Sequence, residues 1–448
     1  MIAENRNIMF ILLGMLAVIA LIAIAMNGTQ DTQEEVIIPE EILDCDYCTF
    51  NYRTLFTLAY TYLQPDGNRV VEGKLDIQNA EHIEVELEGE PEWVLAAPSD
   101  KGSIWAVVMD DGAVQAFDFS DGKLEATNIS PSRIHADSPP VLMIKDNEPF
   151  ILAPGIWNES LLSHPIILAS SGRTVFIDNT GDLVFRVNEK EFARFEVNAL
   201  PDARLLIDEN ERILLLTGPT EEYGHGALGD SIEASSITIV DTAGVPNISK
   251  VIDIPGGDVV EGIAPIWTDL NNDGDREIIV TLSNSKEGAR LVVFDEEGNI
   301  VADGPDTGTG YKWRHQVAIA PLGPDGENEI VDVLTPHIGG IVEFYRWEGD
   351  ELKVVTSLAG YSSHLAGSRN LDMALAGDFD EDEDLEVLVP LQNHLELAVL
   401  EHTNDRVKVV ADIELTGSLS TNIAAMNYEN EKFAIGIGTS NDVLHIWY

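Results

Sequence analysis

Two stretches of alternating oxygen-bearing side chains constrain the fold of this chain more than any other feature. The first, DLNNDGDREIIV, runs from Asp269 to Val280, and the second, DFDEDEDLEVLV, runs from Asp378 to Val389. In each, a short acidic turn leads into a β-branched apolar run. Because Ca²⁺ takes roughly six to eight oxygen ligands, alternate side chains of such a turn can surround one ion. The pattern predicts two calcium loops, each followed by a strand.

The apolar run after each loop recurs along the chain. Glu277 in the first loop and Glu386 in the second are 109 residues apart, and Glu329 lies about midway. Weaker echoes lie around Ser103, Glu148, Arg212 and Glu431. A period of about 40 to 50 residues is typical of propellers and solenoids. We therefore predict an all-β propeller of seven blades, with six or eight blades as the alternatives, each blade having three or four short strands.

The ring of blades is predicted to be closed by the N-terminal part of the repeat region. The last unit ends in LHIWY after about three strands, whereas residues 53–91 alternate weakly, as in HIEVELEG. A strand from this region would complete the last blade, and closure removes free sheet edges. The propeller is therefore assigned to residues 53–448. A modular ring also suits a chain of 448 residues, because a single core stops growing at about 250 to 300 residues.

The segment before the propeller is predicted to tether it to a membrane. Residues 8–26 form an uncharged, mainly apolar run, and a helix of this length spans about 28 Å, close to the hydrocarbon core of a bilayer. Arg6 precedes the run and acidic residues follow it, which places residues 1–7 in the cytoplasm and the bulk of the chain outside. The alternative is a cleaved signal peptide, because Ala23 and Ala25 form an A-x-A site, and the protein would then be secreted.

Residues 27–52 are polar and acidic, and we interpret them as a stalk. They contain CDYC, in which Cys45 and Cys48 are the only cysteines of the chain. Outside the cell, where thiols oxidise, this pair predicts a local disulfide.

The charge of the chain limits its partners. It has 78 acidic against 26 basic residues, a formal net charge of −52. Such a surface repels nucleic acid and anionic lipid, so neither is expected as a binding partner.

The calcium loops differ from an EF-hand, because position twelve is Val280 in one and Val389 in the other, where an EF-hand has Glu. They resemble the calcium loops of FG-GAP or VCBS repeats, the blades of integrin-alpha-type β-propellers, with degenerate matches over most of residues 95–448. The resemblance implies these ligands: Asp269, Asn271, Asp273 and Glu277 by side chain with Asp275 by its carbonyl, and Asp378, Asp380, Asp382 and Glu386 by side chain with Asp384 by its carbonyl. Glu383 departs from the pattern by replacing the turn glycine, which predicts backbone strain. The ions would be structural.

The face opposite the calcium loops is the predicted ligand site. In a four-stranded antiparallel blade, the second-to-third loop and the crossing to the next blade share the face that the first-to-second loop does not occupy. These segments carry scarce basic and polar side chains: His225, Arg314, His315, His337, His364, Arg369 and Asn370. Histidine could act there as a base or metal ligand, and arginine could bind a carboxylate.

These features support more than one function. The first is a non-enzymatic, membrane-tethered and calcium-stabilised module that binds a glycan or protein outside the cell, as in adhesion. The alternative is an extracellular polysaccharide-degrading enzyme of lyase type that uses the His and Arg residues, an idea supported by fold analogy alone. A quinone-dependent dehydrogenase is disfavoured, because no repeated tryptophan-docking pattern is present.

Overall fold

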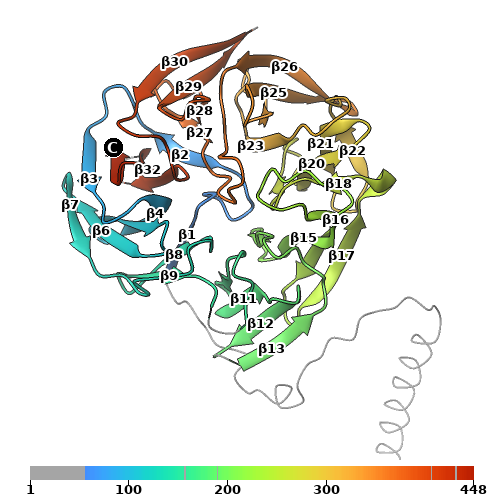
Figure 1. Cartoon of the computed structure of the whole chain (residues 1–448), viewed down its shortest axis with the longest axis horizontal. Coiled ribbons are helices and arrows are strands. Elements are labelled where there is room, and N and C mark those ends of the chain that lie inside the picture. The colour runs from blue at the N-terminus through green and yellow to red at the C-terminus, as the bar shows by residue number, and fades with distance from the viewer. Residues whose placement is uncertain (1–55, 156–157, 189, 405, 429–430) are drawn as a thin grey trace, which may run out of the picture. The chain divides into compact units, whose positions relative to one another are not determined.

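The computed structural model describes residues 56–155, 158–188, 190–404, 406–428 and 431–448. The regular secondary structure of these residues is β-strand, joined by turns and loops, with one short 3₁₀ turn at Pro255–Gly257 (η2). Figure 1 shows small antiparallel sheets arranged radially around a central axis, which is the architecture of a β-propeller. The prediction of an all-β propeller is confirmed.

The strand pairings divide the ring into groups, which we number as blades and describe from the innermost strand outwards. Blade 1 contains β4 (Pro91–Ser99), β5 (Gly102–Met109), β6 (Val114–Ser120) and β7 (Lys123–Thr127), and blade 2 contains β1 (Phe56–Tyr60), β8 (Val141–Lys145) and β9 (Glu148–Leu152). Blade 3 contains β10 (Ile166–Leu168), β11 (Arg173–Ile177), β12 (Leu183–Val187) and β13 (Lys190–Phe195). Blade 4 contains β14 (Leu206–Ile207), β15 (Ile213–Thr220), β16 (Glu233–Asp241) and β17 (Asn247–Asp253).

Blades 5 to 8 complete the ring. Blade 5 contains β19 (Ile266–Thr268), β20 (Glu277–Asn284), β21 (Gly288–Phe294) and β22 (Ile300–Asp303), and blade 6 contains β23 (Arg314–Ala320), β24 (Glu329–Leu334), β25 (Ile341–Glu348) and β26 (Glu351–Ala359). Blade 7 contains β27 (Leu375–Asp378), β28 (Glu386–Pro390), β29 (Glu396–Thr403) and β30 (Arg406–Glu414). Blade 8 contains β31 (Ala424–Tyr428), β32 (Lys432–Thr439), β33 (Val443–Trp447) and β3 (His82–Glu86). The short β18 (Val259–Val260) pairs with both β16 and β20.

The predicted count of seven blades is not confirmed, because the pairings of the described strands separate eight groups. The additional group is blade 3, which shows no echo of the calcium-loop pattern. Its neighbour, blade 2, takes only β8 and β9 from the local sequence and completes itself with β1 from the N-terminal region. One whole blade therefore lies between the echoes at Glu148 in blade 2 and Arg212 in blade 4, where the sequence suggests none.

The predicted ring closure is confirmed. Strand β3, from the HIEVELEG segment, pairs antiparallel with β33 and becomes the outermost strand of blade 8. The register runs from His82 opposite Trp447 to Glu86 opposite Val443. Closure removes the edge that β33 would otherwise expose to other chains.

Between β1 and β3 the chain runs along the inside of the ring, as Figure 1 shows for β1 and β2 (Val70–Lys74). We call Thr61–Ile77 the central segment. Its backbone bonds to the innermost strands of successive blades: the carbonyl of Pro65 accepts from Ile207, and that of Asp66 accepts from Trp267. Strand β2 then pairs in parallel with β27. The sequence did not predict this path.

Apolar side chains from adjacent blades form the core. One cluster joins blades 6 and 7, another joins blades 7 and 8, and a third joins blades 8 and 1. A blade lies on either side of most inner strands, so both faces of β14, β19, β23 and β27 are buried along almost their whole length. Gly436 shows how closely blades pack, because a Cβ added there would lie 2.2 Å from Cζ3 of Trp105.

In the part of the chain that the structure describes, no helix has the length and apolarity needed to cross a membrane. The predicted anchor at residues 8–26 lies outside the described residues, as do residues 1–7, the stalk at 27–52 and the predicted Cys45–Cys48 disulfide.

Candidate functional site

Both predicted calcium loops connect the first and second strands of a blade. The loop from Asp269 to Glu277 joins β19 to β20 in blade 5, and the loop from Asp378 to Glu386 joins β27 to β28 in blade 7. The two loops therefore open on the same face of the ring. This placement agrees with the sequence prediction that each site links two strands.

The first loop is folded around its own carboxylates. Asp269 accepts hydrogen bonds from the backbone N–H groups of Asp273 at 3.1 Å and Gly274 at 2.9 Å, and Gly274 has a φ of 97°. The Oδ1 atom of Asn271 accepts from Asp273 at 2.8 Å, and Glu277 Oε2 accepts from the N–H of Leu270 at 2.9 Å. Burial raises the pKa of Glu277 to about 7, and the nearby aspartates add to the rise.

The second loop brings more negative charge together. Ligand oxygens of Asp378, Asp380 and Asp382 lie within 4.8 Å of one another. Glu386 is buried; its Oε2 accepts from the N–H of Phe379 at 2.7 Å, while its Oε1 has no hydrogen-bond partner among the described residues. Burial raises the pKa of Glu386 to about 8, helped by the neighbouring aspartates. Such a group is stable as a carboxylate only beside a cation.

Two backbone positions complete the second loop. The N–H of Asp384 donates to Asp382 Oδ1 at 3.0 Å. Glu383 has a φ of 79°, in the left-handed region that favours glycine. The strain predicted from the missing turn glycine is therefore present, and Glu381 adds a second positive φ of 65°.

In related loops elsewhere in the ring, an arginine side chain supplies the positive charge. In blade 6, Arg346 bonds to Glu329 at 2.6 Å, and His402 lies 2.8 Å from the same carboxylate. In blade 4, Arg212 bonds to Asp208 at 2.7 Å. By contrast, among the described residues neither Glu277 nor Glu386 forms an ion pair with Arg or Lys. In the two loops with the complete acidic pattern, no arginine or lysine of the described residues pairs with a predicted ligand carboxylate, and Lys432 reaches only Glu381, which is not a predicted ligand.

On the opposite face, three of the predicted histidines meet around Trp313. We call His315, His337, His364 and Trp313 the histidine cluster. The His337 and His364 rings are hydrogen-bonded, with centroids 4.8 Å apart, and the Trp313 ring lies 5.0 Å from His315 and 5.1 Å from His364. Burial lowers the pKa of His337 to about 4 and that of His364 to about 3. The cluster is therefore neutral at physiological pH.

His225 lies at the edge of this cluster and is bound differently. Its Nδ1 forms a short contact with the carboxylate of Glu261, which also accepts a hydrogen bond from Ser283. Its ring stacks on Tyr311 at 5.3 Å. The Trp313 indole donates to the backbone carbonyl of Glu261 at 3.0 Å. Glu261 therefore holds both His225 and Trp313 in place.

The remaining predicted ligand-binding residues are engaged within the protein. Arg314 pairs with Asp332 at 3.0 Å and with Glu343, and Arg369 pairs with Asp202 at 2.8 Å and with Asp230. Asn370 is buried and donates to the backbone carbonyl of Glu92 at 2.9 Å. The guanidinium group of an arginine that already pairs with two carboxylates is not available to bind the carboxylate of an acidic sugar. This weighs against the lyase interpretation.

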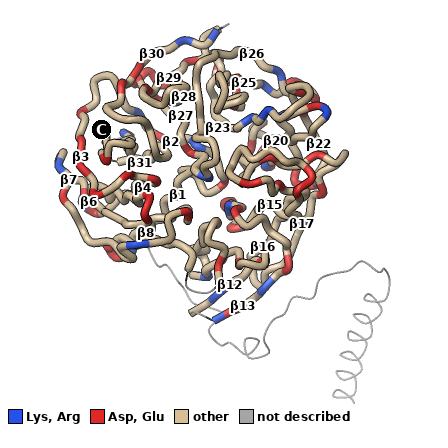
Figure 2. Tube along the Cα trace, in the orientation of Figure 1, with Lys and Arg blue, Asp and Glu red and all other residues tan. Residues whose placement is uncertain are grey.

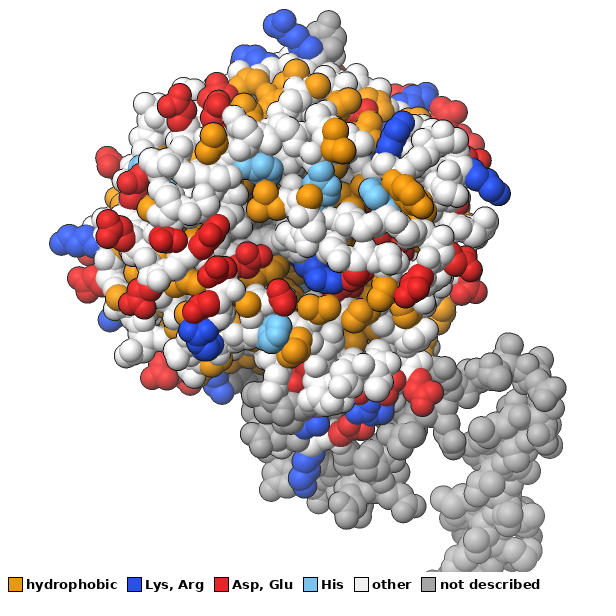
Figure 3. Space-filling model, in the orientation of Figure 1, with side chains coloured by type: hydrophobic (Ala, Val, Ile, Leu, Met, Phe, Trp, Pro, Cys, Tyr) orange, Lys and Arg blue, Asp and Glu red, His pale blue; other side chains and the backbone are white. Residues whose placement is uncertain are grey.

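Exposed apolar side chains on the histidine face were not predicted. Ile338, Tyr311 and Leu395 are 83%, 54% and 47% exposed, and all three lie in second-to-third loops or crossings. Figure 3 shows histidine and hydrophobic side chains around a hollow near the centre of the ring. A sequence signal was available, because Ile338 follows His337 and Leu395 follows His394. We call Tyr311, Ile338 and Leu395 the apolar rim.

A buried ionic network inside the ring was also missed. Asp372 accepts from Arg69 Nε at 2.6 Å, from Arg204 Nη1 at 2.8 Å and from Thr61 Oγ1 at 2.7 Å, and both arginines are almost fully buried. Figure 2 shows basic positions near the ring centre beside β2 and β23 as well as on the periphery. The two arginines hold the pKa of Asp372 well below its usual range against the effect of burial.

Glu233, the first residue of β16, makes stability depend on pH. Burial raises its pKa to about 9 from 4.5, and the nearby Glu261 adds to the rise. The folded chain therefore holds a proton that the unfolded chain has lost, and stability falls as pH rises through this window. We expect Glu233→Gln, which is always neutral, to be more stable than the wild type at pH 8 by at least about 1 kcal/mol, with no difference near pH 4. Urea midpoints across this range test it.

The control for Glu233→Gln is Glu222→Gln, at an exposed position nearby. This variant should keep the pH dependence of the wild type. If the urea midpoints of Glu233→Gln and of the wild type changed equally with pH, Glu233 would be ionised in the folded protein at no energetic cost.

Comparison with solved structures finds similar chains at low sequence identity. The quinohemoprotein alcohol dehydrogenase from Comamonas testosteroni aligns with a TM-score of 0.54 and 9% identity, covering 87% of this chain and 80% of its own. BamB from Moraxella catarrhalis gives 0.46 and 12%, covering 82% and 98%, and the WD40 β-propeller domain of Doa1 gives 0.42 and 8%, covering 82% and 96%. At this identity, the likeness to the dehydrogenase supports the fold alone. No protein-family model and no curated protein sequence matches the chain.

Proposed function

We propose that this protein is a binding module: a calcium-stabilised β-propeller, tethered outside the cell by residues 8–26, that holds a protein or glycan partner on its histidine face. The observation that carries the proposal is the apolar rim. Ile338 is 83% exposed, and it stands with Tyr311 and Leu395 on one face of a molecule whose formal charge is −52. Exposed apolar side chains gathered on one face mark interaction sites more often than isolated ones do.

The chemistry of the face suits a partner with apolar and polar groups. The histidine cluster offers neutral rings beside an indole, and the positive charges of Arg314 and Arg369 are each offset by two carboxylates. Burial of aromatic and aliphatic anchors supplies most of the affinity of such faces, while surrounding polar groups exclude water. The face therefore fits recognition of a surface rather than of a small charged ligand.

Calcium supports this function indirectly. The proposal that both acidic loops bind Ca²⁺, as their resemblance to FG-GAP or VCBS repeats implies, is supported by the contrast with Glu329 and Asp208, which use arginine. A filled loop would hold the first two strands of blades 5 and 7 in register. The opposite face is built on those same blades, so their rigidity would pre-organise it.

The partner surface is tested with Ile338→Asp and Leu395→Asp. The full chain is displayed on cells and crosslinked to its surroundings, and each recovered protein is then purified and tested for binding on its own. The full chain is also tested for binding to a glycan array. We expect each substitution to weaken binding of the partner by about 30-fold or more, since an anchor contributes about 2 kcal/mol.

Matched controls for the rim are Val251→Asp and Val354→Asp, which introduce the same charge at exposed valines on the outer strands β17 and β26. These variants should bind as the wild type does. Equal loss in all four variants would indicate a charge effect, and unchanged binding in Ile338→Asp and Leu395→Asp would exclude the rim as the interface.

A further inference from the structure

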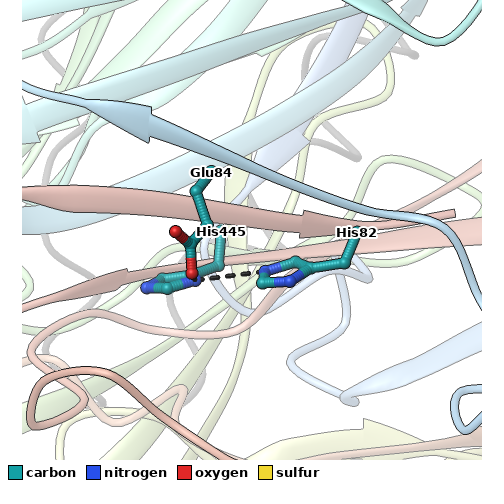
Figure 4. Close-up of side chains that lie close together, drawn as sticks. All are labelled: His82, Glu84 and His445. Carbon is teal, nitrogen blue, oxygen red and sulfur yellow. Dashed lines mark hydrogen bonds and ion pairs between the residues drawn. The ribbon is translucent and has the colours of Figure 1, made fainter.

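A group of metal-ligand side chains lies away from both acidic loops, where the ring closes. It consists of His82 and Glu84 on β3 and His445 on β33 (Figure 4). We call these three residues the closure site. They come from opposite ends of the propeller, with His82 and His445 separated by 363 residues in the chain. His82 and Glu84 lie in HIEVELEG and His445 lies in LHIWY, the two segments predicted to close the ring, but no metal site was predicted there.

The pairing of β3 with β33 places the three side chains on one face. Glu84 lies directly opposite His445, and His82 is two residues before Glu84, so the alternation of a strand points both the same way. Ile83 and Val85 point to the other face, where they pack against the apolar cluster between blades 8 and 1. The register that closes the ring is therefore also the register that assembles the site.

The separations of the ligand atoms fit a small tetrahedral ion. His82 Nε2 lies 3.2 Å from His445 Nδ1, and Glu84 Oε1 lies 3.5 Å from the same nitrogen. Zinc binds imidazole nitrogen and carboxylate oxygen at about 2.0 to 2.2 Å, and tetrahedral angles then place ligand atoms about 3.3 Å apart. Two histidines and one glutamate also form a known ligand set for this metal.

Hydrogen bonds determine which nitrogen of His445 can bind a metal. The hydroxyl of Thr439 donates its single proton to Asn441 Oδ1 at 2.7 Å, so it can only accept from His445 Nε2, which lies 3.1 Å away. With the proton on Nε2, as the contact with Thr439 favours, the lone pair of Nδ1 points toward His82 and Glu84; the Thr416 hydroxyl also lies 3.4 Å from Nε2. A hydroxyl that accepts a hydrogen bond from the other ring nitrogen orients a metal-bound histidine.

The second histidine is held in place by packing. The His82 ring stacks on Trp447 with centroids 4.4 Å apart and planes 6° apart, and it lies nearly parallel to the His445 ring. A histidine binds metal as the neutral imidazole, the form that prevails above its ordinary pKa of about 6.5. The Glu84 side chain is 49% exposed, which gives an ion a route from solvent.

We propose that the closure site binds a zinc-class divalent ion through His82 Nε2, His445 Nδ1 and the Glu84 carboxylate, with water in the fourth position. The ion links β3 to β33 and thereby fastens the ring at its closing strand. Because the ligands come together only in the folded ring, binding free energy becomes stability of the closed propeller. This site is independent of the partner face and of the acidic loops.

The test is calorimetric titration of the full chain with zinc alone, in excess Ca²⁺ so that the acidic loops are saturated. We expect one zinc per chain, a melting temperature that rises with zinc, and an affinity at least tenfold weaker in His82→Ala and Glu84→Gln. The matched control is Glu86→Gln, an exposed glutamate on the same strand. It should bind zinc as the wild type does.

The variant Glu84→Gln keeps the test valid if His82→Ala does not fold, because Glu84 is half-exposed. His337→Ala is titrated in parallel to detect zinc held by the histidine cluster. Loss of the binding event in His337→Ala, with full affinity retained in His82→Ala and Glu84→Gln, would overturn the closure site. So would the absence of binding in the wild type.

Discussion

Replacing Asp372 with alanine is expected to lower the free energy of unfolding by about 3 to 5 kcal/mol, a larger loss than we expect from any of the other substitutions. Asp372 is the shared acceptor for Arg69 and Arg204, whose side chains are only 4% and 1% exposed. Without it, two guanidinium groups remain buried near each other with no carboxylate between them. The cost is that of uncompensated buried charge, which exceeds the cost of a lost hydrogen bond.

The effect should extend to the central segment. Arg69 also donates to the backbone carbonyl of Val317, and Thr61 donates to Asp372, so this carboxylate anchors Thr61–Ile77 to the inner strands. Urea unfolding gives the stability, and hydrogen exchange should show faster exchange in this segment. Asp372→Asn retains the shape and should be less harmful.

The control for Asp372→Ala is Asp111→Ala, which breaks the exposed pair with Arg133. An exposed ion pair contributes little, so the urea midpoint should stay at the wild-type value. Equal midpoints for Asp372→Ala and the wild type would show that the two arginines do not need this partner.

Loss of calcium from a single loop is expected to have the second largest effect. At a free Ca²⁺ concentration of 100 times Kd, each occupied loop contributes about 2.7 kcal/mol, so a chelator should lower the melting temperature in two separable steps. Asp269→Ala should abolish one binding event and Asp378→Ala the other, as measured by calorimetric titration. Asp325→Ala is the matched control, because the carboxylates of its loop pair with Arg346.

The affinity for calcium should rise with pH. Calcium binds the carboxylate form, and Glu277 and Glu386 have pKa values raised to about 7 and about 8. A proton must leave before the ion binds, so affinity increases as pH rises through this range. The metal-free chain should show the opposite trend and lose stability over the same window, because its folded state holds the protons. A calcium affinity independent of pH from 6 to 9 would exclude these two glutamates as ligands.

Local patterns in the sequence predicted the elements that depend on neighbouring residues. The acidic turns at Asp269 and Asp378 lie between the first two strands of a blade, and the HIEVELEG segment closes the ring. Both are short-range signals: alternation with period two for a strand, and alternating oxygen side chains for an acidic turn. The gathering of His315, His337 and His364 followed from knowing which loops share a face.

The blade count and the occupation of the ring centre could not be read in the same way. Strand β1 completes blade 2 although its partner β8 lies about eighty residues further along the chain, so the local sequence of that blade looks incomplete. The arginines also needed the structure, because Arg314 and Arg369 look available in sequence but bind carboxylates from other strands and loops.

The sequence by itself determined the strand pattern and the acidic turns, because each is encoded within a few consecutive residues, and their repetition about every 40 to 50 residues indicated the propeller architecture. Only the tertiary structure decided which charges are compensated. Arg346 supplies the positive charge for Glu329 but no arginine among the described residues reaches Glu386, and Asp372 lies 303 residues from Arg69. Such pairings depend on how distant strands meet in a closed ring, and the free energy of a buried charge is set by those partners rather than by its neighbours in sequence.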